Sequence, residues 1–234
     1  ELTGLLNKEA FYRKIRENLD LHPDRSYMII RWDIDNFSVL NDMLGTKTGD
    51  RILCDIADAM RIFSVPDSVY ARLQNDHFAY FYPMDQKKPA DFNDLLTNWL
   101  AKYETDFKVV CRIGVYPIDD PALEPSIMCD RALLALRSIK GSYTNSIAFY
   151  DDSFLQKLRQ EQALMAEVEP ALANGEFLVY FQPQYNGSTG ALLGAEALVR
   201  WNHPRLGLVA PGVFLPLFER NGYITRLDEF IWER

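Results

Sequence analysis

The fold is decided by the stretch SYMIIRWDIDNFSVLNDMLGTKTGDRILCDIADAMRIF at residues 26–63. Its first part, residues 26–33, is an apolar, β-rich run that ends in acidic residues, which predicts a buried strand. From Gly49 the pattern changes, because apolar side chains recur at helical spacing and Asp50 stands at the start. These side chains belong to Ile52, Leu53, Ile56, Ala57, Met60 and Phe63. We therefore expect an amphipathic helix that packs on a sheet containing the strand.

The flanking segments extend this pair to a mixed βααββαβαβ unit that follows a leading helix. The runs VYARL and HFAYFYP are separated only by residues 74–76 and predict a tight hairpin, because Asn and Asp favour turns. By the same period arguments, other helices are expected at residues 8–21, 92–100, 125–140, 152–174, 211–220 and 223–234. Other strands are expected at residues 108–117, 147–150, 177–183 and 191–201. The expected fold class is α/β.

Acidic residues gather where the first strand and the hairpin end. Asp33 and Asp35 close the strand and leave it on the same side by the period of two, while Asp76 lies at the hairpin tip. A hairpin that pairs beside the first strand would bring Asp76 close to Asp33. Two carboxylates with carbonyl oxygens and water are a typical Mg²⁺ arrangement for a nucleoside triphosphate. On spacing alone, it stays open that Asp33 and Asp35 only cap a helix and that Asp76 only belongs to a turn.

Five motifs in register resemble the GGDEF domain of diguanylate cyclases. They read LTGLLN (2–7), DIDNFSVLNDMLGTKTGD (33–50), RLQNDHFAYF (72–81), RIGVYP (112–117) and CDRALLALR (129–137). The resemblance implies an adenylyl-cyclase-like α/β sandwich on a mixed, mostly antiparallel sheet, which agrees with the predicted element order. Active members of that family condense two GTP molecules into cyclic di-GMP, and each of two domains presents one Mg²⁺-bound GTP to the other.

The resemblance assigns roles to individual residues. It makes Asp33 a metal ligand, helped by the Ile34 carbonyl, and makes Asp76 the second acidic ligand, for Mg²⁺ or Mn²⁺ bound with GTP. Asn41 and Asp50 fall where the family contacts the guanine base. Both types fit this role, because Asn offers a donor and an acceptor and a carboxylate accepts from the guanine N–H groups.

The signature departs from the family pattern. In place of Gly-Gly-Asp-Glu-Phe it reads Gln74, Asn75, Asp76, His77 and Phe78. Both glycines, which let the backbone approach the nucleotide without a Cβ in the way, are replaced. Ser38 stands where the family usually has a lysine near the phosphates, whereas Arg137 keeps a cation late in the domain as a nucleotide-binding residue. The family's Arg-x-x-Asp inhibition motif is absent, because the matching stretch is Val65–Ser68. Because small displacements of catalytic groups cost on the order of 100-fold in rate, we expect no cyclase turnover.

The last third of the chain resembles the start of EAL domains, phosphodiesterases that open cyclic di-GMP. The similarity lies in GEFLVYFQPQYN (175–186), GAEALVRWNHPRLGLVAP (194–211) and FLPLFERNGYI (214–224). It makes Glu196 a metal ligand in the mouth of a TIM-like barrel, Gln182 a contact to the dinucleotide and Arg200 a partner for its phosphate. On strand alternation alone, these polar residues could equally mark a solvent face. His203 is expected in a loop.

A TIM-like barrel takes roughly 250 residues, so we interpret this part as an incomplete piece of one. The chain is then an excised piece of a longer tandem GGDEF-EAL protein. We divide it into a degenerate GGDEF domain at residues 1–151, a connecting helix at 152–176 and the truncated N-terminal part of an EAL domain at 177–234.

Composition excludes several classes of protein. The chain carries 25 Lys plus Arg against 33 Asp plus Glu, a net charge of −8, so broad nucleic-acid binding is not expected. No apolar run approaches the roughly 20 residues of a membrane span, so no membrane partner is expected for this piece. The cysteines Cys54, Cys111 and Cys129 lack CxxC spacing and are expected to be reduced core thiols of a cytoplasmic protein. The parent could still be membrane-tethered through upstream regions.

The leading functional hypothesis is a catalytically inactive GGDEF module that binds GTP with Mg²⁺ and regulates the EAL phosphodiesterase of the parent. Cyclic di-GMP would then bind through the complete EAL domain, and the piece itself is not expected to be an enzyme. The alternative from another class is a non-binding scaffold or homodimerisation domain. A residual diguanylate cyclase is the third reading.

Overall fold

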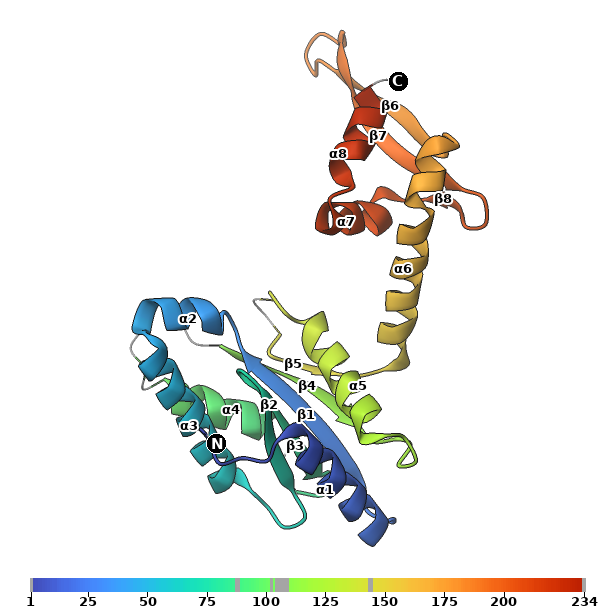
Figure 1. Cartoon of the computed structure of the whole chain (residues 1–234). Coiled ribbons are helices and arrows are strands. Elements are labelled where there is room, and N and C mark those ends of the chain that lie inside the picture. The colour runs from blue at the N-terminus through green and yellow to red at the C-terminus, as the bar shows by residue number, and fades with distance from the viewer. Residues whose placement is uncertain (1, 87–88, 102, 104–109, 143–144, 233–234) are drawn as a thin grey trace. The chain divides into compact units, whose positions relative to one another are not determined.

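The computed structural model describes residues 2–86, 89–101, 103, 110–142 and 145–232. The chain divides into two compact units, Glu1–Leu155 and Gln156–Arg234 (Figure 1). Unit 1 contains the strands β1 (Tyr27–Ile34), β2 (Val69–Gln74), β3 (His77–Pro83), β4 (Cys111–Pro117) and β5 (Ile147–Phe149). Its helices are α1 (Lys8–Leu21), α2 (Phe37–Leu44), α3 (Thr46–Phe63), α4 (Pro89–Leu100) and α5 (Pro125–Ser138). This order is the expected βααββαβαβ unit after a leading helix.

The sheet of unit 1 has the order β2-β3-β1-β4-β5. Three of its pairings are antiparallel and only β4 with β5 is parallel, which confirms the mixed, mostly antiparallel sheet. All eight residues of β1 are buried, because the strand lies at the centre of the sheet and both of its faces are covered by helices. The residues that follow β1 are therefore held by a rigid element.

Helices cover the two faces of this sheet in separate layers. On one face, α3 and α4 pack around Trp32, with Ile56 and Phe92 at its side. On the other face, α1 and α5 pack over Tyr27 and Ile29. This side alternation along β1 follows from the strand period of two. Since Trp32 and Asp33 are neighbours, Asp33 belongs to the α1/α5 side.

The turn between α2 and α3 explains why α3 begins earlier than expected. Gly45 has φ 79° and its N–H donates to the Asn41 carbonyl, so it ends α2 in a conformation that favours glycine. The chain then enters α3 at Thr46, one turn before the predicted start at Gly49. The expected strand at 108–117 begins at Cys111 in the structure, and residues 108–109 lie outside the described part.

Unit 2 contains α6 (Asp152–Ala173, beginning in unit 1), β6 (Phe177–Tyr185), β7 (Leu192–His203), β8 (Gly207–Val209), α7 (Pro211–Asn221) and α8 (Ile224–Trp232). Its three-stranded sheet has the order β6-β7-β8 and is antiparallel. Phe177, Trp201 and Phe214 form the centre of a small core against α6, α7 and α8. The structure adds β8, a three-residue strand that is too short to show a period in the sequence.

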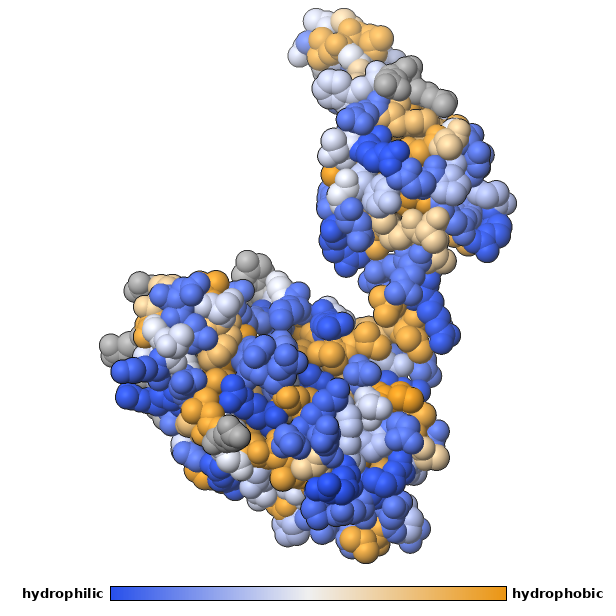
Figure 2. Space-filling model, in the orientation of Figure 1, coloured by the Kyte–Doolittle hydropathy of each residue, from blue (hydrophilic) through white to orange (hydrophobic). Residues whose placement is uncertain are grey.

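The β6–β7 hairpin of unit 2 carries exposed apolar side chains. Phe181, Tyr185, Leu192 and Leu193 are each more than three-fifths exposed, and Figure 2 shows apolar surface at the tip of this hairpin. Such exposure fits an open, partial barrel, because apolar side chains on both faces of the hairpin are left uncovered. None of the helices in the described part of the chain combines the length and apolarity that crossing a membrane requires.

Candidate functional site

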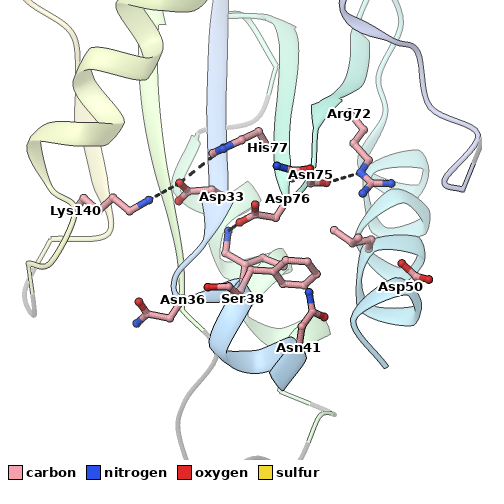
Figure 3. Close-up of a pocket in the computed structure, with 13 residues that line it drawn as sticks. Asp33, Asn36, Ser38, Asn41, Asp50, Arg72, Asn75, Asp76, His77 and Lys140 are labelled. Carbon is pink, nitrogen blue, oxygen red and sulfur yellow. Dashed lines mark hydrogen bonds and ion pairs between the residues drawn. The ribbon is translucent and has the colours of Figure 1, made fainter. Parts of the chain in front are cut away.

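A pocket of about 560 Å³ opens where β1 ends, beside the β2–β3 turn (Figure 3). Residues from β1, α2, α3, the hairpin and the segment after α5 converge on it. Its lining consists of Asp33, Ile34, Asn36, Phe37, Ser38, Asn41, Asp50, Leu53, Arg72, Asn75, Asp76, His77 and Lys140. The structure thus brings together four of the polar residues that the sequence proposes for nucleotide and metal binding: Asp33, Asn41, Asp50 and Asp76.

Strand pairing places the hairpin turn at the pocket. β3 lies next to β1, with Phe78 opposite Trp32, so the turn at Asn75 and Asp76 stands beside the end of β1. Asn75 has φ 50°, a conformation that Asn tolerates better than most residues. Its carbonyl accepts a hydrogen bond of 2.5 Å from Arg72 Nε. The turn that replaces the Gly-Gly pair is therefore a formed and braced structure.

Asp33 of β1 and Asp76 of the β2–β3 turn both lie at the end of β1. Asp76 Oδ2 accepts a hydrogen bond of 3.4 Å from the Ile34 backbone N–H, as Figure 3 shows. The Cys111 thiol on β4 lies close enough that both carboxylates raise its pKa, although burial is the main cause of its rise to about 12. The expectation that hairpin pairing brings the two carboxylates together is confirmed by this geometry.

The Asp33 side chain is only 5% exposed and has a lysine ammonium and an imidazole beside it. Lys140 Nζ lies 2.9 Å from Asp33 Oδ2, and His77 Nδ1 lies 3.9 Å from the same oxygen. Arg31 lies on the same face of β1, and burial lowers its pKa while Asp33 acts in the opposite direction. Asp33 Oδ1, in contrast, is buried without a hydrogen-bond partner in the described structure.

Asp35 does not line the pocket, but its contacts agree with the expectation that it leaves the strand on the side of Asp33. Its backbone N–H donates to the Val110 carbonyl at 3.0 Å, so the pairing with β4 continues past Ile34, and Arg112 lies opposite Asp33 in this pairing. The Asp35 carboxylate forms an ion pair with Arg112 of β4, and Asp35 is absent from the pocket lining. Its role in the described structure is to join the ends of two strands.

Asn41 and Asp50 face the pocket from α2 and α3. Asn41 Oδ1 is buried without a hydrogen-bond partner in the described structure. It occupies space over Gly49, where a Cβ would overlap it. An unpaired buried amide oxygen is costly, which marks it as a position for a ligand donor. Arg137, the other expected nucleotide contact, is exposed in the last turn of α5 and is not among the lining residues.

The arrangement does not fit a divalent cation as it stands. In the part of the chain that the structure describes, no group of three or more His, Cys, Asp and Glu side chains is placed to hold a metal. The ammonium of Lys140 lies on one Asp33 oxygen, and Asp76 Oδ2 is turned to the Ile34 N–H. The unpartnered Asp33 Oδ1 is the remaining feature that suits a cation.

Lys140, like Arg72 of β2, is a charged pocket residue to which the sequence analysis assigns no role. It stands in the segment between α5 and Gly141, three positions after Arg137. The signal that could have indicated it is its position, because Lys140 is a second basic residue near the end of α5, close to Arg137, which the resemblance assigns to nucleotide binding. Its contact with Asp33 depends on the packing of α5 against β1, which the sequence pattern does not specify.

In unit 2, Gln182 and Glu196 lie directly opposite each other on β6 and β7. Arg200 lies opposite Leu178 four positions along, so the three polar residues share one face of the sheet. Gln182 and Glu196 are exposed and Arg200 is half-buried. This arrangement agrees with the alternation predicted from the sequence, which places the three residues on one face of the sheet.

The sequence analysis expects His203 in a loop, but it is the last residue of β7. It is 2% exposed, and its Nε2 lies 2.9 Å from a carboxylate oxygen of Glu167 on α6. Its Nδ1 accepts hydrogen bonds from the backbone N–H groups of Arg205 and Leu206. The expectation that the cysteines are core thiols is confirmed for Cys111 and Cys129, which are buried. It is wrong for Cys54, which is half-exposed.

Comparison with known families agrees with both units. The family described as "Diguanylate cyclase, GGDEF domain" matches residues 1–146, and the family described as "EAL domain" matches residues 165–234. Together with the fold, these matches define a GGDEF-EAL module of cyclic di-GMP signalling. The chain belongs to the GGDEF domain family, whose match covers more than half of its length.

Known relatives share the same two-part organisation. The chain is 26% identical over 241 residues to the bifunctional diguanylate cyclase/cyclic di-GMP phosphodiesterase MucR of Pseudomonas aeruginosa, covering 98% of this chain and 35% of MucR. It is 29% identical over 243 residues to the cyclic di-GMP phosphodiesterase NbdA of the same organism, covering 100% of this chain and 31% of NbdA. The chain therefore spans about a third of the length of these relatives.

A solved structure shares the fold of both units. The S helix-GGDEF-EAL structure of Vibrio cholerae LapD, bound to c-di-GMP, matches with a TM-score of 0.60 and 18% sequence identity. The match covers 100% of this chain and 56% of the LapD chain. At this identity the likeness establishes the fold alone.

Proposed function

We propose that the GGDEF unit is a regulatory module that binds a guanine nucleotide such as GTP without turning it over. The observation that carries this proposal is that one and the same pocket, at the end of β1, is lined by the expected base contacts and the expected acidic ligands. These residues are Asn41, Asp50, Asp33 and Asp76. The output would be control of a cyclic di-GMP phosphodiesterase to which the EAL part belongs. Since GTP and cyclic di-GMP chemistry belongs to the cytoplasm, we place the module there.

Guanine is the base that the polar lining suits. The unpartnered Asn41 Oδ1 needs a donor, and the Asp50 carboxylate, which also lines the pocket, accepts hydrogen bonds. Guanine offers N1–H and N2–H donors on one edge, whereas adenine lacks both. Binding would therefore satisfy a buried acceptor that is left unpaired in the described structure.

The absence of turnover follows from the hairpin turn. Asn75 and His77 both line the pocket beside Asp76, where the family has glycine and an acidic residue. The Asn75 side chain occupies space that a glycine would leave to the nucleotide backbone contact. Arg72 braces this turn through the Asn75 carbonyl, so it does not move aside freely. Phosphoryl transfer depends on placement of the reacting groups, so a displaced triphosphate is held but not condensed.

One observation favours the alternative of a non-binding scaffold or dimerisation domain. Lys140 and His77 already lie beside the Asp33 carboxylate, so this buried charge has partners without a ligand. In that case the pocket would be vestigial, and unit 1 would act through a homodimer or through its surface alone. A residual diguanylate cyclase is the weakest candidate, because both signature glycines are replaced.

For the EAL part, we propose that Gln182, Glu196 and Arg200 belong to the cyclic di-GMP site of the longer protein. Their support is a shared face on β6 and β7, with Glu196 opposite Gln182. Glu196 would serve a metal and Arg200 a phosphate, since a guanidinium pairs well with phosphate oxygens. The similarity to MucR and NbdA, which are both described as cyclic di-GMP phosphodiesterases, supports this assignment.

The decisive experiment titrates GTP calorimetrically into the chain, with Mg²⁺ and with EDTA, and analyses the mixture for cyclic di-GMP. We expect saturable binding without product, and about fivefold weaker binding for Asn41→Ala, because a ligand hydrogen bond is worth about 1 kcal/mol. ATP should bind more weakly than GTP. Asn18→Ala, on α1 and outside the pocket lining, is the matched control. A silent titration together with a dimer that does not respond to GTP would support the scaffold instead.

A further inference from the structure

The Asp33 carboxylate needs a positive partner because it is almost fully buried. Its side chain is 5% exposed at the end of a central strand that is buried along its whole length. An isolated carboxylate in such a place is strongly disfavoured unless a cation or several donors neutralise it. In the described structure, Lys140 Nζ at 2.9 Å is the nearest group that does so.

The fold sets the backbone position of Lys140, from which its exposed side chain reaches Asp33. It follows the last turn of α5 and precedes Gly141, which has φ 83° and lets the chain reverse. Its side chain is 56% exposed and extends across the pocket rim to Asp33 (Figure 3). The aliphatic part of the side chain is exposed, while the ammonium contacts Asp33 and faces the pocket.

The rest of the ligand set for a divalent ion is not free. Asp76 Oδ2 points to the Ile34 N–H at 3.4 Å, and His77 approaches the same Asp33 oxygen as Lys140, at 3.9 Å. A divalent cation would either have to displace the ammonium from Asp33 Oδ2 or bind the unpartnered Oδ1 against the repulsion of the Lys140 charge at close range. The observed donor set therefore disagrees with a resident Mg²⁺ or Mn²⁺.

We propose that Lys140 is the built-in cation of this pocket, which excludes a divalent metal from Asp33 and makes anion binding in the pocket independent of metal. A phosphate group in the pocket would meet the Lys140 ammonium directly, as a point charge. The consequence for nucleotide binding rests on the proposed function, whereas the exclusion of metal from Asp33 does not. Lys140 would then set which form of the nucleotide, free or metal-bound, the module recognises.

The test measures Mn²⁺ binding to the nucleotide-free chain by electron paramagnetic resonance. We expect weak binding by the parent chain and about tenfold tighter binding by Lys140→Gln, since removal of a near cation relieves repulsion at a partly buried site. Lys140→Arg should behave like the parent, because it retains the charge. Lys157→Gln, an exposed lysine in unit 2, is the matched control.

The gain must also depend on Asp33. In the double variant Lys140→Gln with Asp33→Asn, the additional Mn²⁺ affinity should disappear. Equal Mn²⁺ affinity of the parent chain and Lys140→Gln would overturn the proposal, and so would a gain that persists without the Asp33 carboxylate.

A second arm separates this inference from the proposed function. GTP is titrated in EDTA and in Mg²⁺, and we expect less than a twofold difference for the parent chain and a clear Mg²⁺ requirement for Lys140→Gln. If the Mn²⁺ results hold but GTP does not bind at all, the nucleotide function fails while the metal exclusion stands. If GTP binds the parent chain only with Mg²⁺, the metal-independent mode is refuted while nucleotide binding stands.

Discussion

Asp76 accepts a hydrogen bond from the backbone N–H of Ile34, so the tip of the β2–β3 hairpin is tied to the end of β1. The contact joins residues that are 42 positions apart, and it forms because β3 lies next to β1 in the sheet. This hydrogen bond holds the hairpin turn in position beside Asp33. The pocket therefore keeps its shape through strand pairing, even though both glycines of the family signature are replaced.

The first prediction concerns Gly114, where α5 approaches the sheet most closely. A Cβ at this position would overlap the backbone of Ala132 and Leu136 on α5. Because backbone atoms cannot move aside as a side chain does, Gly114→Ala should lower the free energy of unfolding by about 3 kcal/mol. Urea denaturation followed by circular dichroism measures this. Gly187→Ala, where a Cβ meets nothing within 4 Å, should change stability little.

The second prediction contrasts Gly49 with Gly114. A Cβ at Gly49 would overlap the side-chain oxygen of Asn41, which can rotate away. Because Gly49 lies inside α3, alanine also gains about 1 kcal/mol of helix propensity. Gly49→Ala should therefore leave stability nearly unchanged while weakening GTP binding about as much as Asn41→Ala does. A loss of stability like that of Gly114→Ala would contradict this account of the pocket.

The third prediction concerns the hairpin turn. Asn75 has φ 50°, which glycine adopts without penalty, so Asn75→Gly should fold as stably as the parent chain. Removing its side chain from the pocket should strengthen GTP binding several-fold in calorimetry, because more room is left for the nucleotide. Asn75→Val, a β-branched residue at positive φ, should destabilise by about 1–3 kcal/mol. Unchanged GTP affinity of Asn75→Gly would show that this side chain does not restrict the pocket.

Much of unit 1 could be predicted from the sequence because its signals are local. The apolar period of α3 and the turn residues of the hairpin depend on neighbours in the chain, and both elements are found where expected. The proximity of Asp33 and Asp76 followed from strand adjacency alone. Asp35 does not line the pocket because its carboxylate pairs with Arg112 of β4, a contact between strands that the local pattern does not indicate.

The parts that could not be predicted depend on packing between distant elements. Lys140 reaches Asp33 across 107 positions, and only the docking of α5 on β1 and β4 brings them together. His203 reads as a turn residue from the proline that follows it, but its burial comes from the contact with Glu167 on α6. In both cases the local sequence pattern does not indicate which distant side chain is the partner.

The fourth prediction uses the three cysteines. Burial raises the pKa of the Cys111 thiol to about 12 and that of the Cys129 thiol to about 12, so at pH 8 about one in ten thousand is ionised. Cys54 is half-exposed. Native protein treated with iodoacetamide at pH 8 should therefore be modified rapidly at one cysteine, identified by mass spectrometry, and Cys54→Ser should abolish the rapid phase.

The same shifts determine the sign of a pH dependence. Because Cys111 and Cys129 have folded-state pKa values above the ordinary value of 9.0, their neutral forms stabilise the fold fully below pH 9. This contribution is lost as the pH rises from about 9 towards 12. Urea midpoints should fall over that range, and the fall should be smaller when Cys129 is replaced by alanine. A midpoint that rises above pH 9 would contradict the assigned burial.

The last prediction concerns the buried His203 of unit 2. Its Nδ1 accepts two backbone hydrogen bonds, which assigns the proton to Nε2, and this N–H donates to Glu167. His203→Ala would leave these donors and the carboxylate without their partner, at a cost of about 2–4 kcal/mol in the unfolding of unit 2. Glu167→Gln retains an acceptor oxygen and should cost less than 1 kcal/mol. Fluorescence of Trp201, which packs beside His203, reports the transition, and equal effects of the two variants would show that the charge of Glu167, not the hydrogen-bond geometry, holds this corner together.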